Sequence, residues 1–111
     1  MTVSIPPSIK RFSILGAVCF ALGVSSLAGA ARSGEQVFNT YCVACHMSGV
    51  AGAPKFGNRA DWQPRIDKGL DTLLKDAISG IKAMPPKGLC FDCSDDELKL
   101  AIEYMIDNSK D

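Results

Sequence analysis

The feature that most constrains this chain is the pentapeptide Cys42-Val43-Ala44-Cys45-His46. Two cysteines three positions apart, followed at once by a histidine, form the C-x-x-C-H pattern. At the end of a helix the two thiols can add to the two vinyl groups of a porphyrin, and the next imidazole can then ligate the iron. His46 is the only histidine in the chain, so no other histidine competes for that role. The motif predicts one covalently attached haem c, with Cys42 and Cys45 as its thioether sites and His46 as the proximal iron ligand.

The N-terminal thirty residues have the three-part composition of an export signal. The basic pair Lys10-Arg11 is followed by an uncharged apolar segment, and Ala28-Gly29-Ala30 fits the small-residue pattern after which signal peptidase cleaves. We therefore expect residues 1–30 to be a cleaved signal peptide and residues 31–111 to be a periplasmic domain that carries the haem. The alternative is an uncleaved anchor, because residues 12–31 are just long enough to span a bilayer.

The predicted mature domain is small and nearly neutral. It holds ten Lys and Arg against twelve Asp and Glu, which gives a net charge of −2 before any cofactor is counted. This balance argues against nucleic acid, or an anionic membrane surface, as a partner of the cleaved protein. A domain of this size has little core of its own and usually needs a cofactor, a metal or a disulfide.

Hydrophobic periodicity predicts an all-α fold with three main helices. The first begins at the capping box Ser33–Gln36 and runs to about Ala44. The second carries apolar residues at helical spacing from Leu70 to Ile81, with Asp71 as a plausible cap and Gly80 as a left-handed end. The third begins at the capping box formed by residues 94–97 and has one apolar stripe, made of Leu98, Ala101, Ile102 and Met105.

The segments between these helices are predicted to enclose the cofactor. A shorter helix is expected from Asp61 to Lys68, with Pro64 in its first turn, where proline is tolerated. The connections 47–60 and 82–93 are rich in Gly or Pro and are predicted to be loops. They are too long for a simple bundle, which indicates that they wrap around something.

A second iron ligand is expected from one of the three methionines that follow the signal. Met47 directly follows the proximal histidine and should lie on the wrong face of the ring. Met105 lies on the apolar stripe and is expected in the core. Met84 precedes Pro85-Pro86, which restrict its backbone and hold it in place. Met84 is therefore the predicted axial ligand, and a His/Met pair leaves the iron no open position for oxygen or peroxide.

Cys90 and Cys93 form a second close pair. In an oxidising compartment a disulfide is the first interpretation, and it would join the loop behind Met84 to the last helix. Closing so small a ring contributes about 2 kcal/mol at most on the loop-entropy argument. The alternative is a four-cysteine zinc site with Cys42 and Cys45, which would leave His46 without a role. For Cys42 and Cys45 themselves the alternative is a redox-active dithiol without haem.

In these residues the chain resembles the class I monohaem c-type cytochromes and, within them, the bacterial cytochrome c5 group. The resemblance is to this group rather than to other small c-type cytochromes because of the second cysteine pair, which follows the methionine loop. The resemblance covers nearly all of the predicted mature domain, in the segments Gly34–Phe38, Cys42–His46, Ala51–Pro54, Trp62, Pro64-Arg65, Gly69–Leu74, Met84–Gly88 and Cys90–Leu98.

The resemblance implies roles for several further residues. Gly34 and Phe38 are expected at a helix crossing, packed against Tyr104. The carbonyl of Pro54 is expected to accept the proximal imidazole N–H. Two donors, Trp62 and Arg65, are expected to bind the haem propionates.

The resemblance also implies a function, namely that of an electron shuttle rather than an enzyme. Single electrons would pass between redox proteins, from membrane-bound donors to terminal acceptors, through an exposed haem edge. Two interpretations of the lysines beside that edge are equally open, steering of acidic partners or ordinary solvated side chains, and these lysines are Lys55, Lys82 and Lys87. Two alternatives are a haem sensor or catalyst from which Met84 dissociates, and a subunit of an oxidase complex anchored by an uncleaved N-terminal segment.

Overall fold

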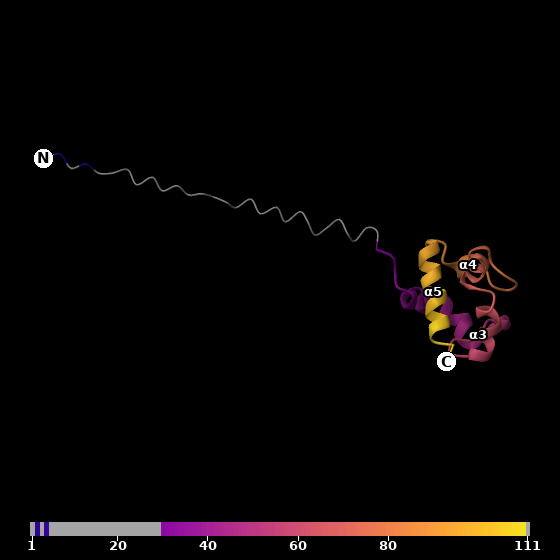
Figure 1. Ribbon diagram of the computed structural model, residues 1–111. Helices are drawn as coiled ribbons and strands as arrows, with labels where there is room; N and C mark the ends of the chain where they lie inside the picture. Colours follow the sequence, from indigo (N-terminus) through magenta and orange to yellow (C-terminus); the bar gives the residue numbers. More distant parts are fainter. Residues whose placement is uncertain (1, 3, 5–29, 111) are drawn as a thin grey trace. The chain divides into compact units, whose positions relative to one another are not determined.

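The computed structural model describes residues 2, 4 and 30–110, and the unit considered below begins at Ala31. The predicted signal peptide therefore lies almost wholly outside the described residues. In the described part the regular structure is helical, with an isolated bridge between Ile81 and Met84 and no strand (Figure 1). None of the helices found there has the length and apolar character that a bilayer crossing requires. The all-α prediction is confirmed.

The first helical run starts where predicted and extends further than expected. Gln36 N donates to Ser33 Oγ at 3.1 Å and Ser33 N donates to Gln36 Oε1 at 2.8 Å, which completes the predicted capping box. Helix α1 (Gly34–Val37), a π-helical segment (Phe38–Cys42) and α2 (Val43–Ser48) follow one another directly. The run therefore ends at Ser48 rather than near Ala44. Gly49 closes it with φ 73°, a conformation that glycine adopts without steric cost.

The two middle helices correct three details of the sequence analysis. Helix α3 (Arg59–Ile66) begins after Asn58, whose side chain accepts the N–H of Asp61 at 3.0 Å. Pro64 consequently lies in the second turn of α3 and not in its first. Helix α4 (Leu70–Ser79) begins after Gly69, so Asp71 lies inside its first turn and does not cap it. Gly80 ends α4 with φ 82° but ψ 148°, which is outside the left-handed helical region.

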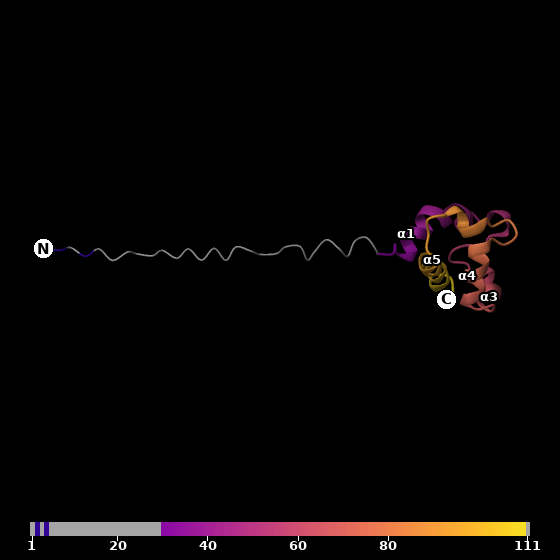
Figure 2. The same cartoon turned by 90° about the horizontal axis from the view of Figure 1, so that it is seen from above.

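The last helix, α5 (Asp95–Asp107), packs against α4 and crosses α1 (Figures 1 and 2). The predicted capping box between Ser94 and Glu97 is present, and the predicted apolar stripe is buried. A Cβ atom on Gly34 would overlap the carbonyl oxygen of Leu100, so only glycine permits this crossing. The rings of Phe38 and Tyr104 lie 5.5 Å apart. The expected contact between Phe38 and Tyr104 is confirmed, whereas Gly34 meets the backbone of Leu100.

The core consists of two clusters of buried side chains that share contact with Cys42. One lies around the second cysteine pair and comprises Val37, Cys90, Cys93, Leu98 and Ala101. The other lies around the aromatic residues and comprises Phe38, Trp62 and Met105. Helix α5 contributes Leu98 and Ala101 to the first cluster and Met105 to the second, so it connects the two.

Candidate functional site

The C-x-x-C-H residues lie at the end of the first helical run, beside a cavity of about 340 Å³. Cofactor pockets in proteins generally span about 300–1,000 Å³. Cys42 closes the π-helical segment, and Cys45 and His46 follow on α2, so all three side chains line the cavity. The thiols of Cys42 and Cys45 are free. Burial, together with the neighbouring Cys45, raises the pKa of the Cys42 thiol to about 11, so this thiol is protonated at neutral pH.

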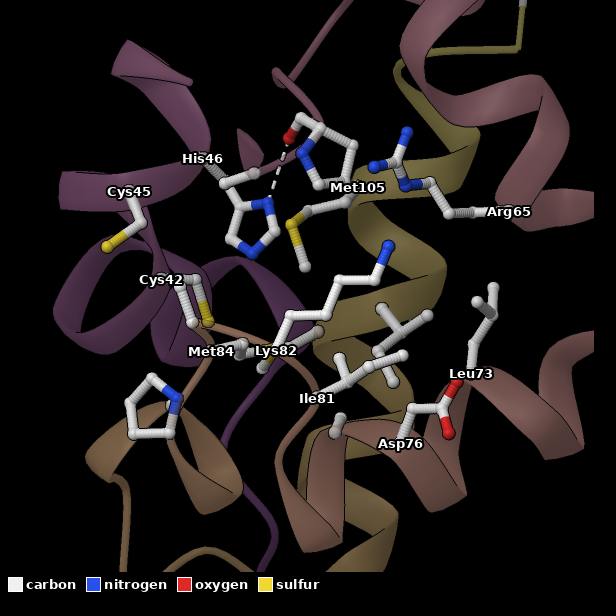
Figure 3. A pocket seen from close by; sticks show the side chains of 18 of the residues that line it. Cys42, Cys45, His46, Arg65, Leu73, Asp76, Ile81, Lys82, Met84 and Met105 are labelled. Carbon is white, nitrogen blue, oxygen red and sulfur yellow. Dashed lines mark hydrogen bonds between the residues drawn. The ribbon is translucent and has the colours of Figure 1, made fainter. Parts of the chain in front are cut away.

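The imidazole of His46 is fixed in orientation and in protonation state. It is 8% exposed, and its Nδ1 lies 2.8 Å from the carbonyl oxygen of Pro54. Because a carbonyl oxygen only accepts hydrogen bonds, Nδ1 carries the proton and Nε2 has a free lone pair. Burial is the main cause that lowers the pKa of His46, and the charge of Arg65 adds to it. The neutral imidazole directs Nε2 into the cavity (Figure 3), which is the arrangement that iron ligation requires.

Met84 enters the cavity from the loop between α4 and α5. Ile81 N donates to Met84 O at 3.1 Å and Met84 N donates to Ile81 O at 2.9 Å, so the two residues close a tight turn. The side chain of Met84 reaches the cavity across from His46 (Figure 3). Met105 also lines the cavity, from the core side, although it is buried in the aromatic cluster. Met47 is 53% exposed and is not among the lining residues.

Trp62 and Arg65 border the cavity from α3 and have unused donor capacity. The indole of Trp62 stacks on His46 with ring centroids 5.9 Å apart. Its Nε1 is buried and has no hydrogen-bond partner in the described part of the chain. The guanidinium of Arg65 donates to the carbonyl oxygens of Asp61 at 2.7 Å and Gly52 at 3.3 Å, which leaves other N–H groups free.

These observations test whether the residues fit a haem. A buried N–H without an acceptor is rare in proteins, so the orphaned indole of Trp62 points to an acceptor that belongs to the cofactor. The haem carboxylates are such acceptors. The free thiols, the correctly oriented imidazole and the thioethers meet the other requirements of haem c. The donor set therefore fits the group that the sequence predicts.

The second cysteine pair is bonded, unlike the free thiols of the C-x-x-C-H motif. A disulfide joins Cys90 to Cys93, and both residues are buried in the core. The guanidinium of Arg32 lies against this disulfide, with Nη2 at 3.8 Å from Cys90 Sγ and 3.5 Å from Cys93 Sγ. Arg32 also donates from Nε to Glu97 Oε2 at 2.6 Å.

The three lysines beside the loops differ in their surroundings. Lys55 and Lys82 are exposed, whereas Lys87 is half-buried and donates from Nζ to the carbonyl oxygen of Cys93 at 3.2 Å. Sequence reasoning did not identify Arg32, or the bond made by Lys87, as parts of this region. Arg32 and Glu97 are 65 positions apart, so no local pattern connects them. Lys87 and Cys93 are closer in sequence, but Lys87 bonds from a backbone with φ 57°, which its own residue type does not favour.

Together, the helical fold and this site define a class, the small c-type cytochromes with one haem. Comparison with known proteins agrees. The family model described as "Cytochrome C oxidase, cbb3-type, subunit III" matches residues 29–105. Cytochrome c5 of Ectopseudomonas mendocina is 55% identical over 83 residues, which span 73% of this chain and 95% of that protein. Cytochrome c5 of Azotobacter vinelandii is 57% identical over 79 residues, which span 69% of this chain and 95% of that protein.

Solved structures agree with the sequence relatives. A mono-haem ferrocytochrome c from Shewanella putrefaciens is 50% identical, with a TM-score of 0.62, and the match covers 68% of this chain and 94% of that one. A cytochrome c crystallised in an electron-transfer complex with nitrite reductase is 41% identical, with a TM-score of 0.66, over 68% of this chain and 93% of that one. The chain therefore belongs to this family of c-type cytochromes and, among the class I monohaem proteins, to the cytochrome c5 group. It is a small electron-transfer cytochrome with a single covalently bound haem c.

Proposed function

We propose that this protein is a periplasmic one-electron shuttle whose haem is attached at Cys42 and Cys45 and ligated by His46 and Met84. The observation that carries the proposal is that the Nε2 side of a neutral His46 and the Met84 side chain face each other across one cavity. Haem c with this ligand pair supplies a one-electron iron couple, whose potential the thioether raises. With both axial positions filled, the site has no place for a substrate, which favours electron transfer over catalysis.

The surrounding residues hold the cofactor and its ligands in place. The carbonyl of Pro54 keeps the His46 proton on Nδ1, so that Nε2 stays available to the metal. Trp62 and Arg65 donate to the haem carboxylates, a role that the unpartnered Trp62 Nε1 supports. The Cys90–Cys93 disulfide ties the loop that follows Met84 to the start of α5.

The two methionines that line the cavity allow a matched test of the sixth ligand. In the ferric protein, the near-infrared band of a methionine–iron bond should disappear in Met84→Ala and persist in Met105→Leu. The reduced Met84→Ala protein should also bind carbon monoxide, which the wild type should not bind at neutral pH. A band that survives Met84→Ala, or that disappears only in Met105→Leu, would show that Met84 is not the sixth ligand. Binding of carbon monoxide by the wild type would favour a sensor or catalyst.

We further propose that the chain is exported and cleaved after Ala30. It then accepts electrons from membrane-bound redox proteins and passes them to terminal acceptor proteins. The structural relative crystallised with nitrite reductase supports acceptors of this kind. Lys82 is exposed and lines the haem cavity, Lys55 is exposed and follows the lining residue Pro54, and both charges favour acidic partner surfaces. The rate of electron exchange with such a partner should fall as salt rises, and it should fall at low salt in Lys55→Glu.

The description of the matched family favours one second candidate, a subunit of an oxidase complex held by an uncleaved N-terminal segment. The mass of the protein recovered from its native host distinguishes the cleaved shuttle from the anchored oxidase subunit. A chain that begins at Ala31 and is released with the periplasmic fraction supports the shuttle. A chain that retains residues 1–30 and copurifies with an oxidase supports the subunit.

A further inference from the structure

One side of the haem cavity is charged, and its charges are not balanced by the protein. The cavity wall is otherwise largely apolar, but five charged residues lie along it, namely Arg65, Lys68, Asp76, Lys82 and Lys87. Lys68 and Asp76 form an ion pair at 3.9 Å, so their charges cancel. Arg65 and Lys82 form no ion pair with any described residue. Lys87 forms no ion pair either, but its Nζ already donates to the carbonyl oxygen of Cys93. Arg65 and Lys82 are therefore the two cations of the cavity whose charges have no anion and that keep donors free for one.

Lys82 is held there by a turn that does not favour lysine. The paired hydrogen bonds between Ile81 and Met84 leave Lys82 at the tip of the turn with φ 52°. Positive φ suits glycine or asparagine, and other residues adopt it at a steric cost. In Figure 3 the side chain of Lys82 runs from the Met84 loop across the cavity, and its ammonium points toward the region where Arg65 also points.

The haem brings two carboxylates to this cavity, and each needs a hydrogen-bonding or charged partner when it is partly buried. Trp62 Nε1 is a donor without an acceptor, and Arg65 has N–H groups to spare. Both residues lie on α3 and line the cavity. A neutral indole and one guanidinium leave one of the two carboxylate charges without a counter-ion.

We propose that the Lys82 ammonium is the counter-ion of one haem carboxylate and that it favours the reduced state of the iron by placing a positive charge beside the porphyrin. This inference deepens the proposed function, because it rests on Trp62 and Arg65 facing the same carboxylates. It also explains why a lysine occupies a position whose backbone favours glycine or asparagine. The role differs from the steering of partners, because it concerns the free protein.

The test compares the haem-loaded wild type with three variants. Lys82→Asn removes the charge and suits the positive φ, so the turn should be preserved. Lys82→Arg keeps the charge. Lys75→Gln is the control, because Lys75 is an exposed lysine on the neighbouring α4 and does not line the cavity. The measurements are the equilibrium constant for reduction, from a redox titration, and nuclear Overhauser contacts between the residue 82 side chain and the haem carboxylate methylenes.

Lys82→Asn should reduce the equilibrium constant for reduction roughly three- to tenfold, as expected for loss of one nearby charge that is partly screened by solvent. Lys82→Arg and Lys75→Gln should both stay within about twofold of the wild type, and wild-type Lys82 should contact the carboxylate methylenes. An unchanged constant in Lys82→Asn, or an equal fall in Lys75→Gln, would overturn the proposal. Loss of the methionine–iron band in Lys82→Asn would also overturn it, because the change would then act on the ligand loop. The band in the wild type and in Met84→Ala tests the ligand assignment separately.

Discussion

The side-chain nitrogen of Lys87 lies 3.2 Å from the carbonyl oxygen of Cys93 and donates a hydrogen bond to it. The backbone of Lys87 bonds to the same cysteine loop, because its carbonyl oxygen accepts the N–H of Cys90 at 3.0 Å. Lys87 therefore joins the loop that carries Met84 to the disulfide at two points. Its φ of 57° is the left-handed conformation that allows both bonds at once.

Removal of the Lys87 ammonium should make the loop that carries Met84 less rigid and the methionine–iron bond easier to break. In Lys87→Met, which keeps the aliphatic stem, the methionine–iron band should disappear at a lower urea concentration than in the wild type. The free energy for loss of the band should be lower by about 1 kcal/mol. Lys99→Met, at an exposed position on α5, should leave the band's urea profile unchanged. If both variants match the wild type, the bond to Cys93 does not support the ligand loop.

The crossing of α1 and α5 should tolerate no added methyl group at Gly34. Gly34→Ala places a Cβ against the carbonyl oxygen of Leu100, and overpacking of this kind costs about 1–3 kcal/mol. The free energy of unfolding, measured with urea on the haem-loaded protein, should fall by that amount. Asn39→Ala, exposed on the same helical run, should change it by less than about 0.5 kcal/mol. If Gly34→Ala lowered the free energy of unfolding no more than Asn39→Ala does, α1 and α5 could move apart at this crossing without cost.

The Arg32–Glu97 pair should make stability depend on acid pH. The hydrogen bond from Arg32 is the first cause that lowers the pKa of Glu97, from 4.5 to about 2, and the backbone N–H of Ser94 adds to it. Because the pKa is lower in the folded state, the pair stabilises the protein above about pH 4.5 and loses this effect as pH falls toward 2.

Unfolding by urea, repeated from neutral to acid pH, measures this dependence. Glu97→Gln should be less stable than the wild type at neutral pH and should lose less stability on acidification. Arg32→Met should behave in the same way. A wild-type profile that matches both variants across the range would show that the pair contributes nothing to the pH dependence.

The second cysteine pair should act as a stabilising crosslink without a metal. The double variant Cys90→Ala/Cys93→Ala should lower the free energy of unfolding by at most about 2 kcal/mol, because it opens a short closed loop. Reduction of the wild type by a thiol should have a similar effect, whereas reduction of the double variant should have none. Stoichiometric zinc in the purified wild-type protein would contradict this account and support a four-cysteine site.

Local sequence was sufficient to predict the features that depend on neighbours in the chain. The two capping boxes, the buried stripe of α5 and the C-x-x-C-H motif involve residues a few positions apart, and the structure contains the predicted helices around them. The register of α3 was predicted less well. Asn58 captures the N–H of Asp61 and starts that helix early, which moves Pro64 into the second turn.

The resemblance supplied two tertiary contacts, Phe38 with Tyr104 and His46 with Pro54, but other tertiary contacts were not predicted. Arg32 lies in the N-terminal segment, yet it bonds to Glu97 and lies against the Cys90–Cys93 disulfide. The positive φ of Lys82 follows from its turn and not from its own preference, so its position in the cavity has no signature in the sequence. The close approach at Gly34 was anticipated, but its partner was not, because the contact is with the backbone of Leu100.

The central claim is that one haem is bonded through Cys42 and Cys45, and the intact mass of the exported, denatured protein tests it most directly. The account predicts the mass of residues 31–111 plus one haem, with no haem retained after denaturation in Cys42→Ser/Cys45→Ser. A correctly exported wild-type protein that has the mass of the polypeptide alone, and that loses all colour on denaturation, would contradict the account.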